Sequence, residues 1–165
     1  SRGLGDVYKR QAKVDNIRFK ETKQKEPQLD IHYTIESSQY GNKTGKRLFI
    51  PVNIFHKGFY SPSNQGERTQ DIQINYGYLD IDSLNIRLPE GYEIESLPKT
   101  TDMETKFGKF HSFITLEEGG NILIVHRLLF HQGNYPKEDN TDFMDFRKNV
   151  ATQYAAKIIV KKSGE

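Results

Sequence analysis

Residue types that commonly carry out chemistry are sparse in this chain. It contains five histidines and no cysteine. The lack of cysteine excludes a disulfide framework, a thiolate zinc site and a cysteine nucleophile. No pair of histidines has an obvious ligand spacing together with a carboxylate, so we predict no metal site and no cofactor. We interpret the five as solvated or hydrogen-bonded strand residues; they are His32, His56, His111, His126 and His131.

Two aspartates resemble the start of an acidic calcium-binding loop. They are Asp80 and Asp82. Such a loop needs an oxygen ligand at its fifth position, glycine at its sixth and glutamate at its twelfth. The chain has Leu84, Asn85 and Gly91 at those positions. We therefore predict a turn between two strands here, in place of a calcium site.

A pair of glutamates, Glu93 and Glu95, shares one face of a predicted strand. Their carboxylates would lie about 7 Å apart, a separation that suits glycosidase chemistry. Such pairs are common on solvent-facing strands, and no supporting motif accompanies this one. The chain also lacks a Gly-x-Ser-x-Gly nucleophile elbow and a Gly-x-x-x-x-Gly-Lys phosphate loop. We predict no catalytic residue and expect that the chain itself is not an enzyme.

The connection from His56 to Gln70 is the longest irregular stretch of the chain. Long connections in compact domains are often functional. Phe59 and Tyr60 stand in it among glycine, serine and proline, and Arg68 follows. Exposed aromatic rings could contact a peptide, a glycan or a neighbouring domain, so these three residues form a candidate interaction surface. The alternative is a loop whose rings tuck against the domain.

Alternation of apolar and polar residues indicates the elements that position these groups. Period-two alternation is typical of antiparallel strands, and it predicts strands over 28–36, 48–54, 72–78, 84–88 and 92–94. Leu29, Ile31 and Ile35 give the first of these a half-buried face. Tyr76 and Tyr78 are interpreted as core residues, with a sugar-stacking platform as the alternative.

A hairpin is predicted over residues 110–130, around the turn at Gly119 and Gly120. Its second arm, residues 122–130, is apolar on both faces, so we expect a central strand that is covered on both sides.

The apolar period changes to that of a helix between residues 136 and 156. Spacings of three and four predict an amphipathic helix over about 138–155, capped by Asn140 or Thr141, and a final strand over about 157–162. The predicted fold is mainly β: an antiparallel two-layer β-sandwich, Ig-like in general architecture, with the helix packed against an edge or end. The apolar stripe consists of Phe143, Phe146, Val150 and Tyr154.

The size and charge of the chain bound its function further. Its 165 residues suit one core, which we assign to a single domain over residues 12–162. Residues 1–11 resemble the translated sequencing-adapter tail that often caps reading frames assembled from environmental DNA, and we predict a non-native tail there. Their formal net charge is +2, which equals that of the whole chain. The formal net charge of residues 12–165 is therefore zero. Basic residues are interspersed with acidic ones, so we expect no nucleic-acid binding. No apolar run approaches the length of a membrane-spanning helix, so we expect no membrane insertion.

An ordered series of motifs runs through the second half of the chain. It comprises Arg68-Thr69-Gln70-Asp71-Ile72, Leu88-Pro89-Glu90-Gly91-Tyr92, Lys106-Phe107-Gly108-Lys109-Phe110 and Lys157-Ile158-Ile159-Val160-Lys161-Lys162. The series resembles the C-terminal β domain, of unknown function, of bacteroidete transglutaminase-like proteins, and the resemblance covers most of residues 12–162. In that family, exported proteins carry a β-rich N-terminal domain, a papain-like transglutaminase domain and this final domain. The resemblance implies a fragment of an exported, periplasmic or cell-envelope protein whose catalytic centre lies upstream; no catalytic residue of the family can be assigned here.

The sequence thus favours a non-catalytic accessory domain that packs against a transglutaminase-like domain in cis. Such a domain should expose an apolar patch when isolated. The alternatives are an autonomous β-sandwich module that binds cell-envelope glycan or peptide, and an independent hydrolase.

Overall fold

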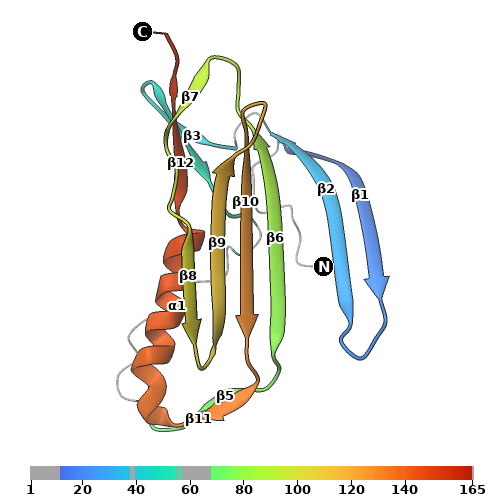
Figure 1. Cartoon of the computed structure of the whole chain (residues 1–165), viewed down its shortest axis with the longest axis vertical. Helices are drawn as coiled ribbons and strands as arrows, with labels where there is room; N and C mark the ends of the chain where they lie inside the picture. Colours follow the sequence, from blue (N-terminus) through green and yellow to red (C-terminus); the bar gives the residue numbers. More distant parts are fainter. Residues whose placement is uncertain (1–11, 38–39, 55, 57–67, 165) are drawn as a thin grey trace. The chain divides into compact units, whose positions relative to one another are not determined.

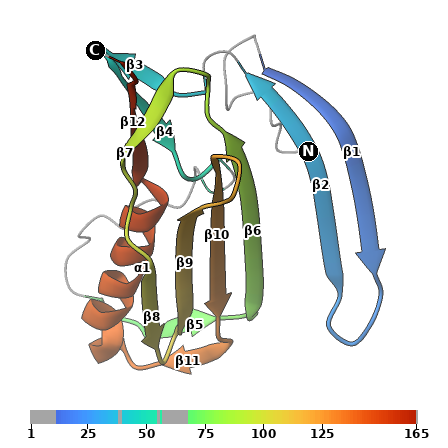
Figure 2. The same ribbon diagram turned by 45° about the horizontal axis from the view of Figure 1, so that its top comes forward.

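A computed structural model of the chain describes residues 12–37, 40–54, 56 and 68–164 (Figures 1 and 2). The chain divides into two compact units, Ser1–Asn42 and Lys43–Glu165. The single domain expected over residues 12–162 stays a prediction. The tail expected at residues 1–11 lies outside the described residues.

The first unit contains a long β-hairpin. Strand β1 (Ala12–Thr22) pairs antiparallel with β2 (Gln28–Ser37), and the register shifts between Asp15 and Arg18. Asn16 lies at this irregularity with a positive φ of 55°, a conformation that asparagine tolerates better than most residues. The strand predicted over 28–36 is confirmed, but only part of its apolar face is half-buried: Ile35 is, whereas Leu29 and Ile31 are exposed.

The second unit is built around a four-stranded antiparallel sheet, which we call the main sheet. Its strand order is β6-β10-β9-β8. The hairpin predicted over residues 110–130 is confirmed as β9 and β10, which pair from Ile122 with Leu116 to Phe130 with Gly108. The strands span Tyr78–Arg87 (β6), Thr101–Thr105 (β8), Gly108–Leu116 (β9) and Asn121–Phe130 (β10).

The helix near the C-terminus, α1 (Asn140–Tyr154), packs on one face of the main sheet. Phe143 meets the ring of Phe107 at 5.1 Å, and Phe146 meets Phe130 at 5.6 Å, both edge to face. The helical periodicity is therefore confirmed, but the helix covers a sheet face and does not sit at an edge or end. The reason is that its aromatic stripe needs the aromatic side chains of β9 and β10 as partners.

The predicted cap of the helix is wrong. A single 3-10 turn, η2 (Lys137–Asp139), precedes α1, and the cap position is Asp139, which makes no side-chain cap hydrogen bond. Its carboxylate instead pairs with Lys106 Nζ at 2.5 Å. No helix in the described part of the chain is long and apolar enough to cross a membrane.

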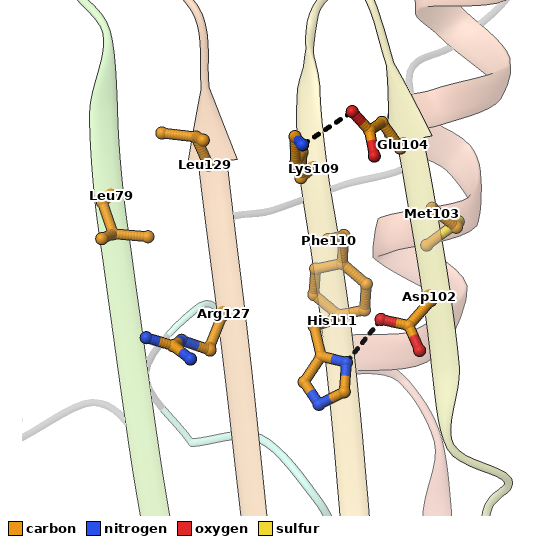
Figure 3. Close-up of a pocket in the computed structure, with 9 residues that line it drawn as sticks. All are labelled: Leu79, Asp102, Met103, Glu104, Lys109, Phe110, His111, Arg127 and Leu129. Carbon is orange, nitrogen blue, oxygen red and sulfur yellow. Dashed lines mark hydrogen bonds and ion pairs between the residues drawn. The ribbon is translucent and has the colours of Figure 1, made fainter.

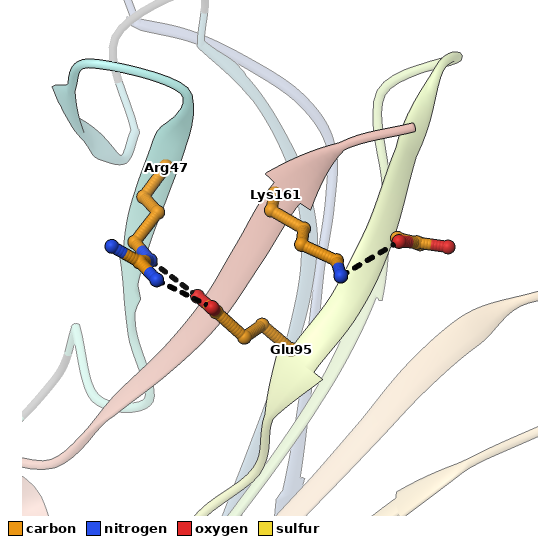
Figure 4. A network of polar contacts seen from close by, with 4 residues as sticks. Arg47, Glu95 and Lys161 are labelled. Atoms are coloured by element: carbon orange, nitrogen blue, oxygen red, sulfur yellow. Dashed lines mark hydrogen bonds and ion pairs between the residues drawn. The ribbon is translucent and has the colours of Figure 1, made fainter. Parts of the chain in front are cut away.

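A second four-stranded antiparallel sheet has the order β3-β4-β12-β7. Arg47 on β4 reaches past β12 to Glu95 on β7 with two hydrogen bonds of 2.6 and 2.7 Å, and Lys161 Nζ lies 3.1 Å from Glu93 (Figure 4). This fork-shaped pair lowers the pKa of Glu95. The strands span Asn42–Thr44 (β3), Arg47–Pro51 (β4), Tyr92–Ser96 (β7) and Lys157–Lys162 (β12).

The structure confirms a mainly β, antiparallel fold with one helix near the C-terminus. The strand expected over 72–78 is divided. Only Ile72–Ile74 (β5) pairs, with Gly133–Tyr135 (β11), before the chain enters β6. Tyr76 falls in the break and is 82% exposed, so its interpretation as a core residue is wrong. Tyr78 is 43% exposed, and the centroid of its ring lies 5.2 Å from that of Phe130.

Candidate functional site

The face of the main sheet opposite α1 carries the most distinctive surface of the second unit. Strand register aligns its side chains in rows across the four strands. We call this surface the open face and define it by three rows: Leu79, Leu129, Lys109 and Glu104; Ile81, Arg127, His111 and Asp102; and Ser83, Val125 and Phe113.

The half of the open face over β6 and β10 is apolar. Leu79 is 55% exposed, Ile81 51% and Phe113, on the neighbouring β9, 37%. Val125 and Leu129 are half-buried beside them. The expectation that β10 is central is confirmed, but it is not covered on both faces. Its second apolar face belongs to a surface that monomeric domains seldom expose without an interaction role.

The other half of the open face is charged and self-paired. His111 Nδ1 lies 2.6 Å from Asp102 Oδ1, and Lys109 Nζ lies 2.6 Å from Glu104 Oε1. These pairs join the edge strand β8 to β9 and remain exposed to solvent, so each contributes little to stability. Both carboxylates on this half therefore already have one partner among the described residues.

A shallow hollow of about 390 Å³ lies on the open face, where the apolar and charged halves meet (Figure 3). Leu79 and Leu129 line one part, and the Lys109–Glu104 ion pair and the His111–Asp102 contact line the other. Arg127 stands between them and has no ion-pair or hydrogen-bond partner within the described residues. The hollow therefore combines an apolar wall with an arginine that makes no direct polar contact.

On the opposite face of the same strands, His126 is buried in the core. It is 1% exposed, and neither of its ring nitrogens has a hydrogen-bond partner among the described residues. Its ring packs against Phe110 and Tyr154, at 6.0 and 5.3 Å between centroids. Burial lowers the pKa of His126 to about 4, which keeps the ring neutral. The interpretation of all five histidines as solvated or hydrogen-bonded is wrong at this position.

His56 lies beside this buried ring and stacks on Tyr154 at 4.8 Å. Its Nε2 lies 2.6 Å from Asp82 Oδ2, and this hydrogen bond raises the pKa of His56. Burial raises the pKa of Asp80, two residues earlier on β6. Both aspartates lie within a strand, so the predicted turn at this position is wrong. This histidine–carboxylate pair tethers the segment that follows β4 to the main sheet.

The remaining predicted site residues are dispersed. Phe59 and Tyr60 lie outside the described residues. Arg68 is exposed and donates hydrogen bonds to the carbonyl oxygens of Gln70 and Asp71. These bonds stabilise the backbone of the residues that follow it. Across the described ranges, no group of three or more histidine, cysteine, aspartate or glutamate side chains could hold a metal ion.

A comparison with protein families places the chain. The model of DUF3858, described as a domain of unknown function with a solved structure, matches residues 46–160. The chain belongs to DUF3858. The matched DUF3858 segment runs from the residue before β4 almost to the end of β12, so it includes the whole main sheet and α1 and omits the hairpin of the first unit. No curated protein and no solved structure shows a significant match.

Sequence reasoning did not single out the open face of this DUF3858 domain as a candidate surface. The signal was present: Leu123, Val125 and Leu129 alternate with the buried positions of β10, and Arg127 interrupts them. A charged residue within a doubly apolar strand indicates a side chain that reaches water, because a buried arginine would need a partner. It does not say whether the rest of that face is covered, which only the tertiary structure decides.

Proposed function

We propose that the chain is a non-catalytic accessory domain of an exported, transglutaminase-like protein, and that it packs against the catalytic domain of that protein in cis. The observation that carries this proposal is the open face, on which Leu79 and Ile81 of β6 and Phe113 of β9 are exposed. An apolar sheet face of this kind is what an inter-domain interface leaves when its partner is absent.

Two further observations support the proposal. The ordered motifs that resemble the C-terminal domain of bacteroidete transglutaminase-like proteins fall largely within the DUF3858 segment. His126 and His56, whose pKa values are perturbed, pack on Tyr154 and lie outside the hollow. Catalytic groups would be expected to line a concave site. The proposed location is periplasmic or at the cell envelope.

A glycan-binding module is the less favoured function. It would present a row of coplanar aromatic rings in a groove. The hollow is lined by one phenylalanine, Phe110, whose ring is buried in the core against His126 and Tyr154. Tyr76 and Tyr78 do not form the expected platform, because Tyr78 turns its ring onto Phe130.

Side-chain footprinting with hydroxyl radicals tests the proposal. The 165-residue chain would be compared with the polypeptide translated from the complete reading frame. We expect Leu79, Ile81 and Phe113 to react in the isolated chain and to be protected in the complete protein. Tyr76, which is exposed and lies off the open face, serves as the control and should react in both. Equal labelling of the open face in the two proteins would overturn the proposal.

A further inference from the structure

The position of Arg127 restricts the chemistry of any partner surface that covers the open face. Its cross-strand neighbours are Ile81 on one side and His111 on the other. Leu79 and Leu129 form the next row of the sheet. In Figure 3 the guanidinium extends toward the Leu79 side of the hollow, away from the Asp102 carboxylate. The cation therefore stands at the border of the apolar half of the face.

The two carboxylates that line the hollow with Arg127 already have partners. Asp102 pairs with His111, and Glu104 pairs with Lys109. Arg127 is left to water for as long as the face is open. A partner that covers Leu79 and Ile81 must displace that water, and a desolvated, unpaired arginine is strongly unfavourable. A purely apolar partner surface would therefore be opposed by this residue.

We infer that the partner of the open face presents an aspartate or glutamate carboxylate that pairs with Arg127, inside an apolar contact over Leu79, Ile81 and Leu129. The inference rests on the proposed function and specifies its interface. An arginine suits this role because its planar fork binds a carboxylate through two parallel hydrogen bonds, and arginine is enriched in the interface positions that dominate binding. The pair sets the register of the two domains, since a carboxylate displaced along the sheet would meet leucine side chains.

A zero-length cross-linking experiment tests this inference. In the complete protein, Arg127→Lys places an amine where the partner carboxylate is expected. A carbodiimide then joins the two as an amide, with the lost water taken up by the reagent. Lys109 and Glu104, 2.6 Å apart, provide an internal positive control for the reaction. We expect a cross-linked peptide that joins residue 127 to an aspartate or glutamate upstream of this chain.

Charge reversal provides the second arm. Arg127→Glu in the complete protein should restore the labelling of Leu79 and Ile81 to the level of the isolated chain. Arg87→Glu is the matched control, because Arg87 is an exposed arginine at the far end of β6 and does not line the hollow. It should leave the protection unchanged. Urea unfolding of the isolated variants confirms that each is folded.

The possible outcomes separate the inference from the proposed function. If Leu79 and Ile81 are protected in the complete protein but residue 127 forms no upstream cross-link and Arg127→Glu keeps the protection, the inference fails and the proposed function stands. A cross-link to Asp102 of the same chain, or to a second copy, also overturns the inference. If the open face is unprotected in the complete protein, the proposed function fails, and the inference with it.

Discussion

At the scale of single residues, His126 is the group whose chemistry and surroundings conflict most. Its strand partners are Asp82 on β6 and the buried Ser112 on β9, and Tyr154 of α1 and His56 also face it. The pKa of His126 falls to about 4 in the folded protein, whereas an unfolded histidine titrates near 6.5. Between these values the unfolded chain binds more protons than the native state.

His126 therefore predicts a loss of stability in acid. The stabilisation from keeping the ring neutral is fully present above pH 6.5 and is lost as the pH falls toward 4, a difference on the order of 3 kcal/mol. His126→Leu, which keeps similar volume and removes two nitrogens without partners, should abolish most of this loss and leave stability at pH 7 equal or higher. Urea unfolding at pH 7 and pH 4.5 measures both. His32→Leu, at an exposed histidine, is the control, and acid sensitivity unchanged in the His126 variant would contradict the prediction.

At the scale of elements, the start of β9 lies close against the backbone of β10. A Cβ built on Gly108 would lie 2.0 Å from the carbonyl oxygen of Leu129. The backbone of Gly108 does not have a positive φ, so the requirement for glycine here comes from space and not from conformation. This glycine lets β9 and β10 stay in register beside Phe107 and Phe130.

Gly108→Ala should therefore destabilise the protein by about 1–3 kcal/mol, as overpacking of a close contact does. The carbonyl of Leu129 belongs to backbone within the central strand and cannot move aside cheaply. Lys109→Ala, at the next residue, removes only an exposed ion pair and should change stability by less than about 0.5 kcal/mol. The midpoints of urea unfolding of the two variants test this prediction. Equal midpoints would show that the backbone of the main sheet can shift to accommodate the added methyl group.

At the scale of the whole molecule, all of the buried hydrophobic side chains identified in the described residues belong to the second unit, from Ile50 to Val160. The hairpin of the first unit instead exposes Phe19, Leu29 and Ile31. Stability should follow this division, because two strands alone bury too little apolar surface to fold in water.

A fragment that begins at Lys43 should therefore keep a cooperative unfolding transition with nearly the midpoint of the full chain. A peptide of residues 12–42 should show no cooperative transition. Circular dichroism with urea titration of the three chains measures this. A fragment 43–165 that unfolds without cooperativity would show that the hairpin contributes to the core.

The sequence predicted much of the fold and little of the candidate site. The β9–β10 hairpin and the periodicity of α1 were predictable because both are local patterns: a Gly-Gly turn between apolar runs, and an apolar stripe at spacings of three and four. Within the site, Arg127 and the apolar positions beside it were visible in β10. Their row partners on β6 and β8 were not, because register between distant strands is a tertiary property.

By itself, the sequence determined that this protein is mainly β, that one helix comes near its C-terminal end, and that it lacks cysteine chemistry. Each of these follows from residue type or from spacing along a single element. Only the tertiary structure decided which face of β10 the helix covers, that His126 is buried without a partner, and that Arg127 shares an open face with Leu79 and Ile81. The reason is that alternation assigns side chains to two faces of a strand but not to core or solvent. That choice depends on what the rest of the chain can pack against each face.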